Sequence, residues 1–223
     1  MRTADVPDTL LVVVAVGLLP FVLLATTSFA KLSIVLGMLR SAFGAAQVPS
    51  GGVVLVLAAL LTGYIMLPVA RAVGVATAPY WPRVTTSAPL QADSGAALLQ
   101  ALDKAKEPVR DFLVHNAGPA ELELFVQLLK QRVAEADRPQ VQSRDFGVAL
   151  PAFFITELKE ALQLGFLLLL PFLVLDLVIA SILASLGMQT LPATGVALPF
   201  KLLLFVTVDG FRTLADALVS GYQ

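Results

Sequence analysis

The sequence contains no cysteine and only one histidine, His115. Without cysteine the chain can form neither a disulfide nor a thiolate metal site. A single histidine cannot by itself build a metal centre or a histidine-based catalytic triad. Glycine patterns of the Walker or GxGxxG type are also missing, so no phosphate-binding loop is predicted. We therefore expect no metal and no cofactor.

Charge is scarce as well. Charged residues make up 14% of the chain, against about 25% in ordinary soluble domains, and apolar residues make up 57%. The formal net charge is −1, and no basic cluster is present, so the electrostatic basis for binding nucleic acid is absent. The mean hydropathy of +0.85 indicates a membrane protein, or one buried in a very large assembly.

Four apolar segments account for this composition. The first, residues 10–30, is long enough to cross about 30 Å of hydrocarbon as a helix, and Pro20 is expected to kink it. The second, 53–70, is near the lower limit for a span. The last two flank a turn marked by Gly187, Pro192 and Gly195, which predicts a helical hairpin.

Between these segments lies a polar middle that holds most of the charged residues. Two stretches of it, 97–117 and 119–136, have apolar residues at helical spacing and are predicted to be amphipathic helices. We therefore expect an all-α fold of membrane-associated hairpins with a small polar helical insert. The predicted divisions are N-terminal hydrophobic helices at 1–70, the polar helical domain at 71–150 and the C-terminal hydrophobic hairpin at 151–223.

Three charged residues, Asp176, Lys201 and Asp209, interrupt the C-terminal hairpin. An ionisable residue within a membrane segment is by default a candidate functional site. Counted from Gly187 and Gly195, the depths of Asp176 and Lys201 in the hairpin differ by roughly 8 Å, which predicts a poor fit within one hairpin. The charges could instead pair with Lys31, Arg40 or Glu157, line an aqueous cavity, or pair with neighbouring subunits.

Several long motifs resemble the larger integral export-gate subunit of type III secretion systems. In the C-terminal half they are LPAFFITELKEALQLGFLLLLPFLVLDLVIASILASLGM and LPFKLLLFVTVDG. In the N-terminal half and the middle they are LLATTSFAKLSIVLGMLRSAFGAAQVPS, TGYIMLPVA and ALDKAKEPVRDFLVHNA. The resemblance covers nearly the whole chain with the motifs in the family's order. This subunit occurs as the R-type protein of injectisomes and the P-type protein of the flagellar export apparatus.

The resemblance implies a structural role in a protein-conducting pore. Several copies, expected to be five, would form a ring that joins two smaller export subunits in a helical cone. That cone would stand on a much larger export-gate protein, at the periplasmic side of the bacterial inner membrane. Unfolded substrates would pass along its axis. The resemblance also suggests that buried charges meet between subunits; the candidates are Asp176, Lys201, Asp209, Glu157, Lys31 and Arg40.

Family members often carry consecutive methionines in the last turn, where soft side chains seal the axis. Here that turn has only Met188, followed by Gln189 and Thr190. The resemblance therefore assigns the constriction to Met188 and Leu191. Met38 and Met66 are further candidates for a contribution to the seal.

Flagellar members usually carry a cleavable signal and an extra N-terminal stretch, and the absence of both here favours an injectisome. The VALPFKLLLFVTVDG run, however, is at least as similar to flagellar members. An alternative function is a small ion-coupled transporter that uses Asp176 and Asp209. An enzyme is not expected. Ser33 and Lys31 have the wrong spacing for a nucleophile and its base, and Glu157 with Glu160 is interpreted as a solvated face.

Overall fold

A computed structural model describes residues 17, 20–44, 49–82, 92–188 and 190–222. Every regular element in these residues is a helix, which confirms the all-α prediction. The predicted span 10–30 lies mostly outside the described residues. Within it, a short helix at Pro20–Thr26 precedes α2 (Phe29–Ala42), and the two are bent by 83°.

The described bend lies at Thr27 and Ser28, several residues beyond Pro20, where the kink was predicted. The hydroxyls of Thr26 and Thr27 donate to the carbonyl oxygens of Val22 and Leu23, at 2.7 and 2.6 Å. Such bonds give the backbone an alternative to continuing the helix. Whether Pro20 also bends the chain depends on residues 18–19, which lie outside the described residues.

Two long apolar helices follow. Helix α3 spans Gly51–Thr77 and is capped by the Ser50 hydroxyl, which accepts a hydrogen bond from the Val53 N–H at 3.4 Å. Helix α7 spans Phe146–Ser185 and continues through Pro151 and Pro171. Both are long and apolar enough to cross a membrane, and the bent pair would make a third span.

The polar middle forms α5 (Ala92–Asn116), α6 (Pro119–Arg132) and a 3-10 helix, η1 (Glu135–Gln140). The two predicted amphipathic helices are therefore confirmed. Because α3 continues to Thr77 and α7 begins at Phe146, the predicted divisions at 70 and 150 fall inside helices.

Helix α6 is fixed against α7 by polar contacts. The Gly118 N–H donates to the Thr156 hydroxyl at 2.8 Å, and Lys159 Nζ donates to Glu121 Oε1 at 3.1 Å. This hydrogen bond from Lys159 holds the pKa of Glu121 below its ordinary value of 4.5. Pro119 at the first helical position and basic residues in the last turn favour this short helix locally.

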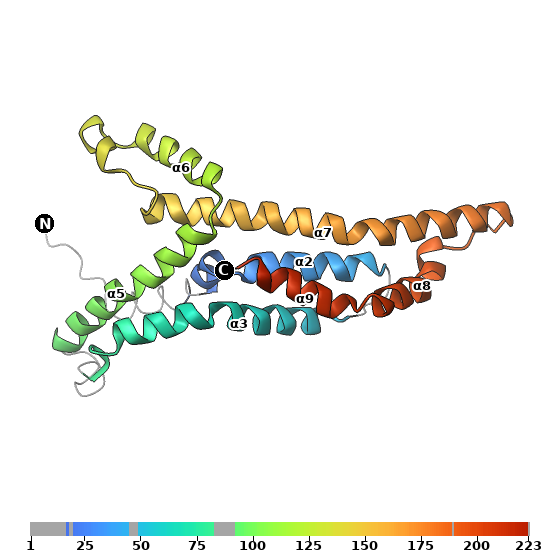
Figure 1. Ribbon diagram of the computed structural model, residues 1–223, viewed down its shortest axis with the longest axis horizontal. Coiled ribbons are helices and arrows are strands. Elements are labelled where there is room, and N and C mark those ends of the chain that lie inside the picture. The colour runs from blue at the N-terminus through green and yellow to red at the C-terminus, as the bar shows by residue number, and fades with distance from the viewer. Residues whose placement is uncertain (1–16, 18–19, 45–48, 83–91, 189, 223) are drawn as a thin grey trace, which may run out of the picture.

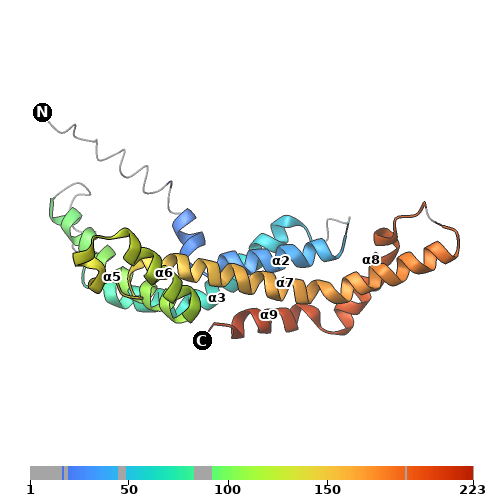
Figure 2. The same cartoon turned by 90° about the horizontal axis from the view of Figure 1, so that it is seen from above.

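The C-terminal part forms α8 (Ala193–Thr207) and α9 (Gly210–Ser220). Helices α7 and α8 make the predicted hairpin, which projects beyond the rest of the molecule (Figures 1 and 2). The break between α8 and α9 lies at Asp209, whose φ of 49° is in the left-handed region. Aspartate tolerates this region better than most residues.

The hydrophobic core is centred on α2, which lies between α7 and α3 (Figure 1). Its inward residues Leu32, Val35, Leu36 and Leu39 follow helical spacing and are 2% exposed or less. Gly165 of α7 allows the closest approach, because a side chain there would overlap the sulfur of Met38. Met38 therefore packs inside the body and not at the hairpin turn.

We predict that Gly165→Leu lowers the thermal unfolding midpoint of the detergent-solubilised protein. The added side chain would displace Met38, and overpacking of this kind costs about 1–3 kcal/mol. Adding Met38→Ala should restore part of the loss. Gly63→Leu on α3 is the matched control, because nothing lies within 4 Å of a side chain there and helix propensity should raise stability by about 1 kcal/mol. Equal midpoints for the two leucine variants would contradict the close contact.

Candidate functional site

Lys201 of α8 is almost fully buried, with 1% of its surface exposed. Its Nζ atom donates to Asp176 Oδ2 at 2.7 Å and to the carbonyl oxygen of Ala42 at 2.8 Å. Ala42 is the last residue of α2, so the ammonium also meets the negative end of that helix. A carboxylate and a helix terminus together compensate the burial of this lysine.

The expectation that Asp176 and Lys201 fit poorly within one hairpin is wrong. Helix α7 ends at Ser185, nine residues after Asp176, and α8 begins at Ala193, eight residues before Lys201. The two residues therefore lie at nearly the same depth, within about 1.5 Å along the helix axes. Counting from Gly187 and Gly195 had misplaced both helix ends. The partner of Lys201 is in its own chain, so this pair does not require a neighbouring subunit.

An aromatic cluster is formed by residues about one helical turn from this pair. The Phe43 ring makes edge contacts with Phe172 and Phe205, with ring centroids 5.4 and 5.5 Å apart. These rings come from the end of α2, from α7 and from α8. Within the described residues the second carboxylate oxygen of Asp176, Oδ1, is buried without a hydrogen-bond partner. The pair therefore lies in surroundings where its two charges depend on each other.

A second buried cluster lies near the start of α2. Lys31 Nζ is 2.5 Å from Glu160 Oε2 and 3.7 Å from Glu157 Oε1, and it lies 4.5 Å from the centre of the Tyr222 ring. Glu157 is 1% exposed, so the interpretation of this carboxylate as part of a solvated face is wrong. Lys31 and Glu157 thus form an ion pair within one chain.

Tyr222 completes the second cluster from the C-terminus. Its hydroxyl donates to Glu157, and its ring stacks on Phe112 of α5 with centroids 6.1 Å apart. Burial, together with the neighbouring Glu157 carboxylate, raises the pKa of Tyr222 above its ordinary value. The sequence placed Lys31 and Glu157 among the candidate charges, but it held no signal for Tyr222, because a C-terminal residue has no periodic context.

The other two predicted charges are placed differently. Arg40 is half-buried at the end of α2, with its guanidinium beside Gly51, and makes no ion pair among the described residues. Asp209 is 67% exposed, and its nearest cation is Arg212 of the same helix end, at 3.9 Å. Burial of either residue by a neighbouring subunit stays a prediction.

The hairpin turn begins with a well-defined helix end. The Met188 N–H donates to the Leu183 carbonyl and the Gly187 N–H to the Ala184 carbonyl, at 2.9 and 3.1 Å. This is the Schellman arrangement, and it requires the positive φ of 73° that Gly187 supplies. Met188 and Leu191 are each 43% exposed at this turn, and Gln189 lies outside the described residues.

We predict that Lys201→Met lowers the thermal unfolding midpoint of the detergent-solubilised chain, because it leaves the half-buried Asp176 carboxylate, whose Oδ1 atom is buried without a partner, with no counter-charge. Loss of one partner of a buried pair costs about 3–5 kcal/mol. Lys201→Met combined with Asp176→Leu should recover most of that loss. Lys106→Ala, which removes an exposed lysine, is the control. An unchanged midpoint in Lys201→Met would show that Asp176 does not depend on this lysine.

The sequence was compared with known families and proteins. It matches the FliP family over residues 11–218. It is 40% identical over 210 residues to "Flagellar biosynthetic protein FliP" of Caulobacter vibrioides, which covers 93% of this chain and 73% of that protein. It is 36% identical over 226 residues to "Hypersensitivity response secretion protein HrcR" of Ralstonia nicotianae, covering 100% of both chains.

A third relative is "Yop proteins translocation protein R" of Yersinia pestis, which is 35% identical over 227 residues and covers 100% of this chain and 99% of that protein. Flagellar and secretion relatives thus match at similar identity, over nearly all of the chain. The resemblance carried by the hairpin and N-terminal motifs is confirmed. The chain belongs to the FliP family and is a component of the type III secretion export apparatus, a bacterial membrane protein with transmembrane helices that serves protein transport.

Proposed function

We propose that this chain is the core subunit of the export gate and that several copies of it form a pore through which unfolded proteins pass. The observation that supports this most is the hairpin. A buried ion pair holds its two arms together, and its projecting turn presents Met188 and Leu191 to the outside. A rigid projection with soft apolar residues at its end is suited to closing an axis when copies meet around it.

The exposed apolar surface also supports assembly. On α7 and α8 the chain exposes many large apolar side chains, among them Leu173, Val174, Leu177, Leu203 and Val206, which are 51–71% exposed. Apolar surface of this extent needs lipid or protein to cover it. Small residues on the same part of α7, Ala180, Ser181 and Ala184, are exposed as well and would let a neighbouring helix approach closely.

The proposed setting is the bacterial inner membrane, with the gate assembled at the periplasmic side of the secretion base. The proposed partners are further copies of this chain, five in all, with two smaller export-gate subunits and the large export-gate protein. In this arrangement the polar helices α5 and α6 would be the part exposed to the periplasm. Exposed ion pairs in this part of the chain, such as Asp111 of α5 with Arg144 at 2.5 Å, are consistent with an aqueous surface.

No contact among the described residues favours the alternative of an ion-coupled transporter. Such a transporter would need free carboxylates at Asp176 and Asp209. The charge of Asp176 is engaged by Lys201, and Asp209 lies on the outside of a helix junction. The two carboxylates belong to different surroundings and do not share a site.

We predict that Met188→Ala leaves the assembled complex intact but makes membranes more permeable to small ions, because a smaller side chain would leave a gap in the seal around the axis. Ion conductance of bacteria or liposomes carrying the complex measures this. The control is Val75→Ala, because Val75 is 77% exposed but lies on α3, away from the hairpin turn. Unchanged conductance in an intact Met188→Ala complex would refute the constriction.

We further propose that the secretion system is an injectisome and not a flagellum. The HrcR and Yop translocation relatives match across 100% of this chain and the Caulobacter flagellar relative across 93%, although the latter is more identical. We predict that deleting the gene for this chain in its native host stops the export of secreted effector proteins and leaves swimming motility intact. Loss of motility with normal effector export would assign the chain to a flagellum.

A further inference from the structure

Helix α9 has a polar face that the buried clusters do not involve. Arg212, Asp216 and Ser220 lie within an arc of about 80° on this helix, and Asp209 directly precedes it as its N-cap. Arg212 is 87% exposed and Asp209 67%. The opposite side, with Gly210, Leu214 and Leu218, is buried in the core. We call the four residues the α9 polar face.

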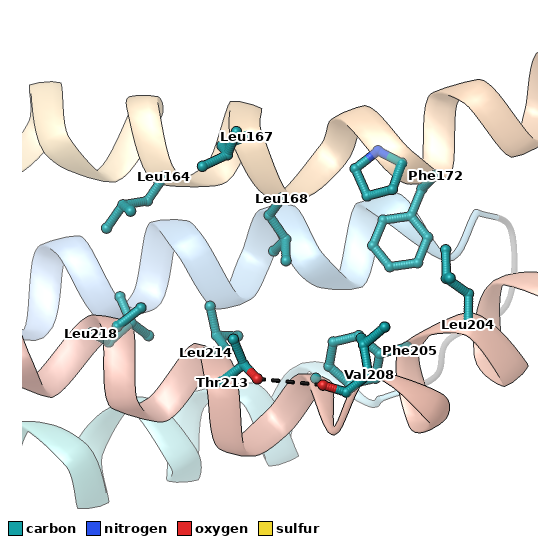
Figure 3. Close-up of a pocket in the computed structure, with 13 residues that line it drawn as sticks. Leu164, Leu167, Leu168, Phe172, Leu204, Phe205, Val208, Thr213, Leu214 and Leu218 are labelled. Atoms are coloured by element: carbon teal, nitrogen blue, oxygen red, sulfur yellow. Dashed lines mark hydrogen bonds between the residues drawn. The ribbon is translucent and has the colours of Figure 1, made fainter.

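The position of α9 along the molecule does not explain why this face of it is polar. A groove of about 340 Å³ separates α9 from α7, and both helices line it (Figure 3). On the α7 side it is lined by Leu164, Leu168 and Pro171, and on the α9 side by Thr213 and Leu218. Helix α9 therefore runs beside the middle part of α7, at the same level.

At that level α7 presents an apolar flank. Leu162 and Phe166, which do not line the groove, are 51% and 60% exposed. Two flanks of the molecule at the same level thus differ in polarity. The flank on α7 suits lipid or an apolar neighbour, and the α9 polar face suits water. Charged residues in membrane proteins face water-filled cavities or protein interiors and avoid lipid. A wall with lipid or protein on one side and an aqueous conduit on the other requires such a difference in polarity between its two sides.

We infer that the α9 polar face lines the aqueous conduit of the assembled gate and contacts the unfolded polypeptide in transit. This inference rests on the proposed function and adds to it the part of the wall behind the constriction. Helix α8 leads directly from the hairpin turn to α9, so one continuous segment of the chain would supply both the constriction and the wall.

The chemistry of the face fits a passing chain better than a bound one. Asp209 and Asp216 carry negative charge and Arg212 positive charge, and Arg212 lies 3.9 Å from Asp209. Such mixed, mutually screened charges attract no single class of sequence strongly. The large apolar residue beside the face, Phe211, is engaged by an edge contact with Phe205 at 4.8 Å. No strong anchor for a peptide is present on the described part of this face.

Because the chain has no cysteine, single cysteines can report on the conduit. The probes are Asp216→Cys and Arg212→Cys on the α9 polar face, each first shown to support secretion. Phe166→Cys on the apolar flank is the control at the same level, and Met188→Cys reports on the constriction. Each assembled complex is treated with a membrane-impermeant maleimide, with and without a secretion substrate that is stalled by a fused, stably folded domain.

We expect Asp216→Cys and Arg212→Cys to react in the assembled complex and to lose most of this labelling when the substrate is stalled. Labelling of Phe166→Cys should not respond to the substrate. If the α9 cysteines label equally with and without substrate while Met188→Cys is protected, the inference fails and the proposed pore stands. If they react only in the isolated chain, a subunit covers the face and the inference fails. If Met188→Cys is not protected either, the proposed function fails as well.

Discussion

The ammonium of Lys201 determines how the C-terminal half is arranged, because a buried cation needs all of its partners in place at once. Its two acceptors come from different elements, a side chain of α7 and the last carbonyl of α2. A shift of either hairpin arm by one residue would move the lysine or its aspartate about 1.5 Å along the axis and rotate it by about 100°. The apolar side chains alone tolerate such slips far better, so the pair fixes the register that the leucines leave open.

Helix α2 is held in the same way at both of its ends. Near its start Lys31 is bound by the carboxylates of Glu157 and Glu160, and at its end the Ala42 carbonyl accepts from Lys201. Both sets of contacts lead to α7, so one central helix is attached twice to the longest helix of the molecule. The glycine at position 165 lies between these attachments, where Met38 packs against the α7 backbone. Charges at the ends and a close apolar contact between them make α2 and α7 one rigid unit.

The sequence was sufficient for the elements but not for their contacts. Long apolar runs and the polar middle predicted helices, the hairpin and membrane association correctly, because hydropathy and helical periodicity are local properties. The Asp176–Lys201 pair was misjudged because helix ends are the least certain part of such a prediction, and here the Schellman turn at Gly187 and the restart at Ala193 differ from the assumed ends. Burial of Glu157 and the role of Tyr222 depend on contacts between residues 65 apart, which no local pattern contains.

The buried and the exposed charges have different roles: the first hold the structure together, and the second are proposed to line the conduit. The buried charges pair within the chain and hold the hairpin as a unit, whereas the charges of α9 face outward beside an apolar flank at the same level. In the proposed pore, the ion pair between Asp176 and Lys201 keeps α7 and α8 together. The hairpin therefore does not open by separating these two helices, because that would expose an unpaired ammonium to apolar surroundings. Changes in aperture are then left to the side chains at Met188 and Leu191, or to rotation of whole subunits, and both leave the buried pair intact.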